Sequence, residues 1–240
     1  MIKRGLIFIA WLGIQLGLLS LGFWQLNRAE EKQTLLDHFT VNQQAAAAPL
    51  ANLLPVTVQQ RYQKIIVQGH FDNQHSFLID NRTYNNQVGY YVITPFVLKA
   101  PLSTTILLIN RGFVPRGAQR ADLPRIPDVT GEQTITAIID FPSQDPFLLG
   151  ENYDPTKVSW PLILQQPITV DMSHVLHQAV YPFIALLYDS CCGFQTDWQP
   201  AQQMPPSTHH GYAVQWFALA VTWLILTSYL YIRRKRRAYE

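Results

Sequence analysis

The sequence predicts a membrane protein of the α+β class, in which two transmembrane helices flank an extracytoplasmic, mainly antiparallel β domain with at least one helix. Two stretches without any charged residue, 5–27 and 211–232, lie near the two ends of the 240-residue chain. All sixteen prolines fall between them, from Pro49 to Pro206, as is typical of a turn-rich domain of short strands. Only 14% of the residues are charged, which is low for a soluble domain.

The first uncharged stretch is long enough, as a helix, to cross a hydrocarbon core of about 30 Å. Lys3 and Arg4 place its amino end in the cytoplasm, because cytoplasmic flanks are rich in cations. It is too long for the core of a signal peptide and no small-x-small cleavage site follows it, so we expect an uncleaved anchor. Apolar residues continue at helical spacing after Arg28, which predicts a helix as far as about Thr40. No arginine-rich presequence stands before it, which favours a bacterial inner membrane over a mitochondrial precursor.

The second uncharged stretch ends at five consecutive cations, Arg233 to Arg237. We expect these cations to stay in the cytoplasm, so that both chain termini are cytoplasmic and His209 lies at the opposite, periplasmic interface. The predicted organisation is a cytoplasmic amino terminus at 1–4, a transmembrane helix at 5–27, an extracytoplasmic β-rich domain at 28–208, a transmembrane helix at 209–232 and a cytoplasmic basic tail at 233–240.

The central domain contains short stretches with the composition and alternation of strands. About six such stretches, separated by turn residues, predict an antiparallel sheet or a small open barrel. Thr169 to Ala179 begins with a capping-type residue and carries an early aspartate, so it is predicted to be the helix of the domain. The segment 43–55 is predicted to connect the first helix to the domain. The predicted strands are 61–69, 76–80, 88–98, 105–110, 131–141 and 182–189.

The outer ends of the two predicted membrane helices carry residues that suit a porphyrin. An imidazole can ligate iron, aromatic rings can pack against the macrocycle, alanines leave room for it, and a guanidinium can pair with a propionate. An aromatic belt at the membrane interface explains the same pattern without a ligand, and from spacing alone it is the commoner case. The residues that share a helical face are His209, Tyr212, Ala213, Trp216 and Ala220 on the second helix and Trp24 and Arg28 on the first.

Two other features have both a functional and a structural interpretation. Gln25 and Gln215 are at matching outer depths, so the two amides can hydrogen-bond across the helix pair. Asn110 to Pro115 is predicted to leave a strand into a sharp turn. Arg111, Arg116, Arg120 and Arg125 would make that loop basic, either to face an acidic partner or lipid headgroups or simply as a solvated loop.

Other function classes have little support in the sequence. Seven of the cations flank the two membrane stretches, so no basic face for nucleic acid remains. His174 and His177 have a spacing that a metal can use, but no further ligand is assigned to them. No nucleophile-elbow or Ser-Lys signature and no glycine-rich phosphate loop is present. The adjacent Cys191 and Cys192 predict either a pair of thiols or, less readily, a vicinal disulfide.

Five motifs occur in order and together resemble the Surfeit-locus cytochrome c oxidase assembly factors, the family that includes yeast Shy-one. The resemblance covers essentially the whole chain, including its two spans, and the motifs are specific only in combination. They are GFWQLNRAEEK at 22–32, VQGHF at 67–71, GYYVITPF at 89–96, NRGFVPR at 110–116 and HHGYAVQWF at 209–217.

The resemblance implies a non-catalytic protein that binds haem a and aids its insertion into oxidase subunit I, with that subunit, the haem a delivery machinery and membrane lipid as partners. The family pattern places the axial iron ligand at His209, with His210 as a neighbour that makes the choice ambiguous. It matches Trp24, Gln25 and Arg28 to a WQxxR motif and Gly69 to a strand glycine. Tyr212 and Trp216 complete the expected cofactor-binding set.

The alternative function is a cofactor-free, membrane-anchored scaffold or chaperone that binds nascent oxidase subunits. In that case the β domain makes the contact and the two helices only anchor it. The residues expected to bind a partner are Asn110, Arg111, Gly112, Phe113 and Pro115.

Overall fold

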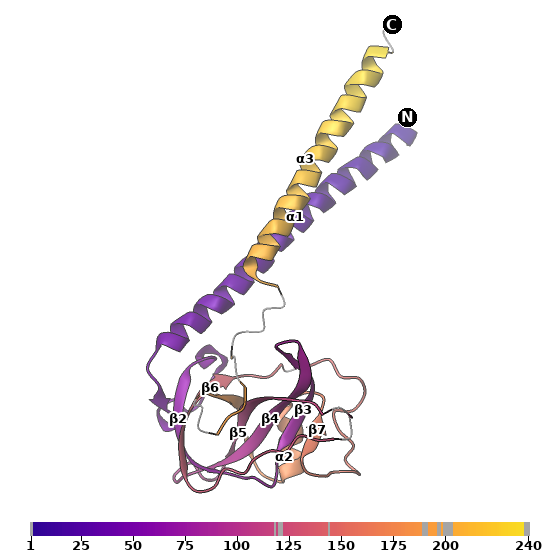
Figure 1. The fold of residues 1–240 in the computed structure, drawn as a ribbon. Helices are drawn as coiled ribbons and strands as arrows, with labels where there is room; N and C mark the ends of the chain where they lie inside the picture. The colour runs from indigo at the N-terminus through magenta and orange to yellow at the C-terminus, as the bar shows by residue number, and fades with distance from the viewer. Residues whose placement is uncertain are drawn as a thin grey trace. The chain divides into compact units, whose positions relative to one another are not determined.

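A computed structural model describes residues 2–117, 119, 122–143, 145–188, 192–195, 198 and 204–237. The chain forms two compact units, Met1–His38 together with Gln199–Glu240, and Phe39–Trp198. The first unit contains most of α1 and all of α3, and the second contains the strands (Figure 1).

The two terminal helices are α1, Ile2–Gln44, and α3, Pro206–Arg237. The prediction that the first helix continues past its uncharged stretch is confirmed, since α1 ends four residues beyond Thr40. Both helices are long and apolar enough to cross a membrane, and only 6% and 11% of their most apolar windows are buried within the protein. Because so little of this apolar surface is covered by protein, it suits lipid rather than a folded core.

Within the described residues, the β unit contains eight strands, one complete α-helix, two short 3-10 helices and the last residues of α1. Each of the six predicted strands corresponds to an observed strand. β1 and β7 have two and three residues, which is too short to show an alternating pattern, and they were not predicted. The elements are β1 Ala48–Pro49, η1 Leu50–Asn52, η2 Val58–Gln60, β2 Lys64–Phe71, β3 Phe77–Tyr84, β4 Gln87–Leu98, β5 Ile106–Pro115, β6 Gln133–Asp140, β7 Leu162–Leu164, α2 Thr169–Leu176 and β8 Val180–Leu187.

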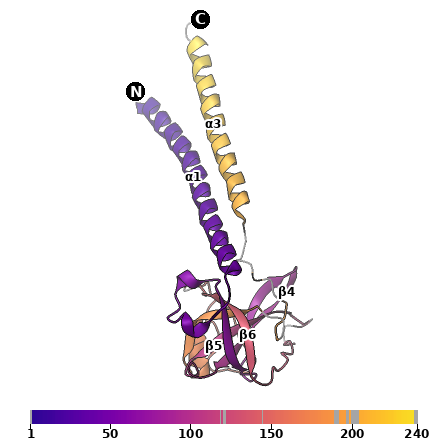
Figure 2. The same ribbon diagram turned by 90° about the vertical axis from the view of Figure 1, so that its left-hand side faces the viewer.

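The strands form a closed barrel rather than an open one. The sheet order is β1-β2-β6-β8-β5-β4-β3-β7, and a further antiparallel pairing of β2 with β4 closes a ring of five strands, β2, β6, β8, β5 and β4. The ring is mainly antiparallel, with β5 and β8 as its parallel pair. β4, β5 and β6 form parts of its wall (Figure 2). The predicted fold class, membrane helices flanking a mainly antiparallel β domain, is confirmed.

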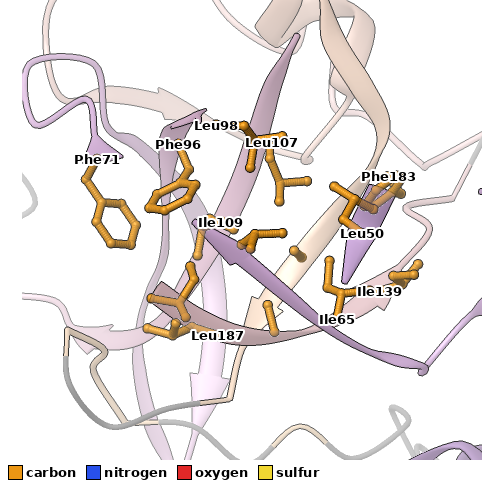
Figure 3. Close-up of a cluster of buried hydrophobic side chains, with 14 of the residues drawn as sticks. Leu50, Ile65, Phe71, Phe96, Leu98, Leu107, Ile109, Ile139, Phe183 and Leu187 are labelled. Atoms are coloured by element: carbon orange, nitrogen blue, oxygen red, sulfur yellow. The ribbon is translucent and has the colours of Figure 1, made fainter. Parts of the chain in front are cut away.

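The barrel interior is filled by side chains. In β2, every second residue from Ile65 to Phe71 is buried, as a strand with one core face requires. Phe96 from β4, Ile109 from β5 and Phe183 from β8 converge on the same cluster (Figure 3). A five-stranded barrel packed in this way is a core and not a ligand cavity.

The predicted sharp turn at Asn110 to Pro115 is wrong, because β5 continues through it to Pro115. Asn110, Arg111, Gly112 and Phe113 are buried, and of this set only Pro115 is exposed. A β-bulge lies here, since Val92 pairs with Gly112 and Ile93 pairs with Asn110, which leaves Arg111 as the extra residue. Gly112 has φ 118°, so the arginine-glycine pair supplies a bulge rather than a turn. The predicted basic loop therefore loses Arg111.

The other arginines of that predicted loop have different outcomes. Arg116 and Arg125 are exposed, whereas Arg120 lies outside the described residues. The same holds for Cys191, so the vicinal disulfide is not tested; Cys192 is buried in the barrel core.

The predicted helix at 169–179 is shorter in the structure. α2 ends at Leu176, because His177 adopts a left-handed conformation with φ 52°. Among the described residues, no group of three potential metal ligands comes together, and His174 and His177 gain no further ligand there.

A half-buried carboxylate, Asp140, predicts an unusual pH dependence of stability. Asp140 Oδ1 lies 2.8 Å from Arg61 Nη2, at the end of β6. Burial raises the pKa of the Asp140 carboxyl above its ordinary value, although Arg61 lowers it. The folded state therefore holds this proton more tightly than the unfolded state, where the pKa is about 3.9. The contribution of Asp140 to stability is present at low pH and falls as the pH rises through the raised folded pKa.

The expected result is that the stability difference between wild type and Asp140→Asn declines as pH rises from about 4. Urea unfolding of the full-length protein in non-ionic detergent measures it. Asp154→Asn is the control with the opposite sign, because the Thr156 side chain lowers the pKa of Asp154 and its contribution is lost as pH falls. If the stability difference between wild type and Asp140→Asn grows with pH, the raised pKa of Asp140 is contradicted.

Candidate functional site

α1 and α3 pack against each other along a stripe with a seven-residue repeat, here called the helix seam. On both helices the spacing between successive seam residues alternates between four and three, as in a coiled coil. All of them are buried or half-buried, although most of both helices is exposed. The seam residues are Trp11, Gln15, Leu18, Gly22, Gln25 and Ala29 on α1 and His209, Ala213, Trp216, Ala220, Trp223 and Thr227 on α3.

Contacts between the helices fix an antiparallel register. Trp11 Nε1 donates to Thr227 Oγ1 at 3.0 Å, and at the other end His209 Nδ1 lies 2.7 Å from Gln25 Oε1. Between them, a Cβ atom added at Gly22 would lie 2.5 Å from the ring of Phe217 on α3. The glycine therefore lets the two helices approach closely, as small residues do in membrane helix pairs.

The imidazole of His209 is held in one orientation by Gln25. Its side chain is buried, with 7% of the residue exposed. Because the amide oxygen of Gln25 can only accept, Nδ1 carries the hydrogen and donates it. The lone pair of the neutral ring is then on Nε2, which is the nitrogen left for a metal. The predicted pairing of Gln25 with Gln215 is wrong, since Gln215 is exposed and His209 takes the Gln25 oxygen.

The remaining residues of the predicted cofactor set lie mostly outside the seam. Trp24 and Tyr212 are exposed by 53% and 41%, and His210 is also exposed. Arg28 Nη1 pairs with Glu31 Oε2 at 2.6 Å on the surface of α1. Trp216 is half-buried in the seam. The structure thus joins His209, Gln25 and Trp216 in one stripe and leaves the other four on the outer surface of their helices.

The two seam alanines have a different environment from the one predicted for them. Ala213 and Ala220 are each 1% exposed, so the packed seam already occupies the space beside them. The Phe217 ring packed against Gly22 leaves no room for a flat macrocycle between the helices at that level. A porphyrin ligated by His209 therefore has to approach from outside the seam, on the side of Trp24 and Tyr212.

The arrangement fits a metal-binding imidazole. A ligating histidine in proteins almost always donates its other ring N–H to a carbonyl or carboxylate, as His209 does to Gln25.

The comparison with known families covers the β unit and most of both terminal helices. The SURF1 family matches residues 13–221, which include the seam from Gln15 to Ala220 and the whole β unit. The chain belongs to the SURF1 family. The resemblance noted in the sequence is thereby confirmed.

Members of the SURF1 family with curated sequences come from bacteria and eukaryotes. A SURF1-like protein of Rickettsia felis is 33% identical over 98 residues, which cover 40% of this chain and 41% of that protein. Surfeit locus protein 1 of Xenopus tropicalis is 29% identical over 157 residues, 59% of this chain and 50% of that protein. A SURF1-like protein of Monosiga brevicollis is 22% identical over 247 residues, 97% of this chain and 90% of that protein. The chain spans half or less of the length of the first two relatives.

Sequence reasoning missed the role of Gln25 as the partner of His209. The signal was the seven-residue repeat in each helix. The two repeats can be seen to face each other only when the helices are aligned antiparallel. In that alignment Gln25 and His209 fall on facing seam positions at the same end, and Gln215 falls off the seam.

Proposed function

We propose that this SURF1-family protein is a membrane-anchored assembly factor for cytochrome c oxidase, which holds haem a through His209 at the outer membrane interface and presents it to oxidase subunit I. The observation that carries the proposal is the hydrogen bond from His209 Nδ1 to Gln25 Oε1, which orients the ring and leaves Nε2 for a metal. When bound, haem a supplies an iron that accepts an axial nitrogen ligand.

Each residue near the ligand has a proposed task on the outer face of the helix pair. Nε2 of His209 would bind the iron, and the exposed rings of Trp24 and Tyr212 would cover the macrocycle. Arg28 would pair with a propionate in place of Glu31, because guanidinium–carboxylate pairs exchange readily at an exposed site. The protein would bind and release haem a without forming or breaking a covalent bond, so we propose no enzymatic activity.

The proposed orientation places both termini in the cytoplasm of a bacterial cell and the β domain in the periplasm. The cations at 233–237 support it, since clusters of this kind remain on the cytoplasmic side of a membrane. His209 is then at the periplasmic end of α3, on the same side as the domain that would meet the oxidase.

The second candidate is the cofactor-free scaffold. The packing of the seam favours it, because His209 is only 7% exposed and its hydrogen bond to Gln25 also serves as a structural link between the helices. In this case the two helices anchor the barrel, and exposed side chains of the β domain bind the nascent subunit.

Replacing His209 separates the two candidates. The full-length protein, purified in detergent from cells that make haem a, is expected to carry a Soret band that His209→Ala removes. His210→Ala is the matched control and is expected to keep the band, because His210 is exposed and lies off the seam. A full Soret band in His209→Ala rejects His209 as the ligand, and normal oxidase assembly in that variant favours the scaffold.

Replacing Gln25 tests whether the imidazole needs its hydrogen-bond partner. Loss of a partner of this kind typically weakens metal affinity by about 10- to 100-fold, so Gln25→Leu is expected to bind haem a more weakly by that factor. Gln215→Leu makes the same chemical change at an exposed position of α3 and is expected to leave affinity unchanged. Haem titration followed by absorbance measures both variants, and equal affinities contradict a role for Gln25.

A further inference from the structure

A donor and an acceptor in the middle of the helix seam have no partner among the described residues. Gln15 and Trp223 lie well inside the two uncharged stretches. The side-chain oxygen Oε1 of Gln15 is fully buried, and so is the indole nitrogen Nε1 of Trp223. Neither atom has a hydrogen-bond partner within the part of the chain that the structure describes.

The two residues lie at the same level of the seam. Trp11 and Thr227 are joined by the hydrogen bond between Nε1 and Oγ1. Gln15 follows Trp11 by one helical turn on the same face, and Trp223 precedes Thr227 by one turn on its face. Because the helices are antiparallel, these two steps go in the same direction, and they bring the indole donor and the amide acceptor to adjacent seam positions.

Leaving both atoms without partners is costly in this environment. Hydrocarbon offers no hydrogen bonds, so a polar atom buried at this depth has to be satisfied from within the protein or by a bound group. The neighbouring polar residue does not satisfy them, since Thr227 Oγ1 accepts from Trp11 and donates to the backbone oxygen of Trp223 at 2.7 Å.

We propose that Gln15 and Trp223 form an intramembrane site for a single hydroxyl group. One hydroxyl oxygen accepts from the indole N–H of Trp223 and donates its own hydrogen to Gln15 Oε1, which satisfies both atoms at once. The depth in the membrane disfavours a charged ligand. The hydroxyl belongs to a water molecule or to the alcohol of a membrane lipid.

Nuclear magnetic resonance of the indole proton tests the site directly. The full-length protein is prepared with ¹⁵N-tryptophan and deuterated carbon positions in discs of phosphatidylcholine, which has no hydroxyl group, and Trp223→Phe assigns the signal. The expected result is a cross-peak between the Trp223 indole proton and water. If a cross-peak appears only after diacylglycerol is added, and it joins the indole proton to the lipid hydroxyl, the occupant is a lipid alcohol. A cross-peak to water and a cross-peak to the lipid hydroxyl both support the site.

Matched variants distinguish the site from general packing. Gln15→Leu is expected to remove the hydroxyl cross-peak, and Gln215→Leu, off the seam, is expected to retain it. The Trp11 indole signal reports on helix pairing one turn away and should stay unchanged. If Gln15→Leu alters the Trp11 signal, the hydroxyl cross-peak is measured instead in Gln15→Met, which keeps the length of the side chain. A cross-peak from the Trp223 indole proton to the Gln15 amide protons without any hydroxyl overturns the proposal, because the two side chains then bond directly. A hydroxyl cross-peak of the Trp223 indole that is unaffected by loss of the Gln15 amide also overturns the proposed site.

Discussion

Gly69→Ala is expected to destabilise the β barrel by about 3 kcal/mol, at the upper end of the usual cost of overpacking. Gly69 faces the core from β2, at the point where this strand pairs with Gln133 of β6 on one side and Leu98 of β4 on the other. A Cβ atom there would lie 2.0 Å from the backbone oxygen of Val97 and 2.9 Å from the ring of Phe96. The nearest obstacle is backbone that closes the barrel, so it cannot move aside as a flexible side chain does.

Urea unfolding of the full-length protein in detergent, followed by tryptophan fluorescence, measures the loss. Gln68→Ala, at an exposed position of the same strand, is the control and is expected to change stability by less than about 0.5 kcal/mol. Since domains are stable by only about 5 to 15 kcal/mol, the expected loss for Gly69→Ala is a large share of the total. Equal unfolding midpoints for the two variants would show that the strand relaxes around the new methyl group.

Arg111→Ala is expected to destabilise the same domain by about 4 kcal/mol, from two charge-assisted hydrogen bonds at about 2 kcal/mol each. The guanidinium is buried, with 2% of the residue exposed. It donates from Nε to the backbone oxygen of Cys192 at 2.9 Å and from Nη2 to that of Pro127 at 3.1 Å. It also lies over the rings of Phe71 and Phe194. One side chain thus holds two distant segments of the chain against the barrel.

Arg111→Lys is expected to recover only about half of that loss, because an ammonium group reaches one of the two carbonyls and lacks the planar fork. Arg116→Ala, an exposed arginine of the same region, is expected to be nearly neutral and is the matched control. Emission from Trp198, whose indole donates to the Leu187 oxygen at 2.6 Å, reports whether the attached segment has come loose. Full retention of stability in Arg111→Ala would contradict this role.

The burial of Arg111 also changes how tests of the proposed role in oxidase assembly are interpreted. Loss of function after substitution at Asn110 to Phe113 is expected from an unfolded barrel alone, since all four residues are buried. Partner binding by this segment therefore stays a prediction, and a fair test of it uses exposed Pro115.

The sequence allowed the broad fold to be predicted, because each signal was local. Absence of charge marked the two helices, and alternation marked β2, where buried and exposed residues follow each other strictly. The barrel closure was not predictable in this way, since the pairing of Gly69 with Leu98 joins strands through contacts that no local pattern encodes. The predicted strand at 105–110 ended too early. β5 is buried on both faces, so its residues do not alternate between buried and exposed, and the Arg111–Gly112 bulge interrupts it.

The candidate site was predictable in part for a similar reason. His209 was found by its position at the end of an apolar helix, which requires only one segment. Its partnership with Gln25 depends on the register between two helices at opposite ends of the chain. Exposure of Trp24 and Tyr212 likewise follows from that register, because it decides which face of each helix is covered.

The ends of the sheet limit how this protein can recognise another chain. Its two terminal strands, β1 and β7, are only two and three residues long, and every other strand of the described sheet has neighbours on both sides. Among the described residues, the sheet therefore offers a partner chain little open backbone, mainly the part of β3 beyond Ile79, which β7 does not pair with. Most of the surface that this domain can present to a partner chain is therefore made of side chains on its loops and on the outside of the barrel.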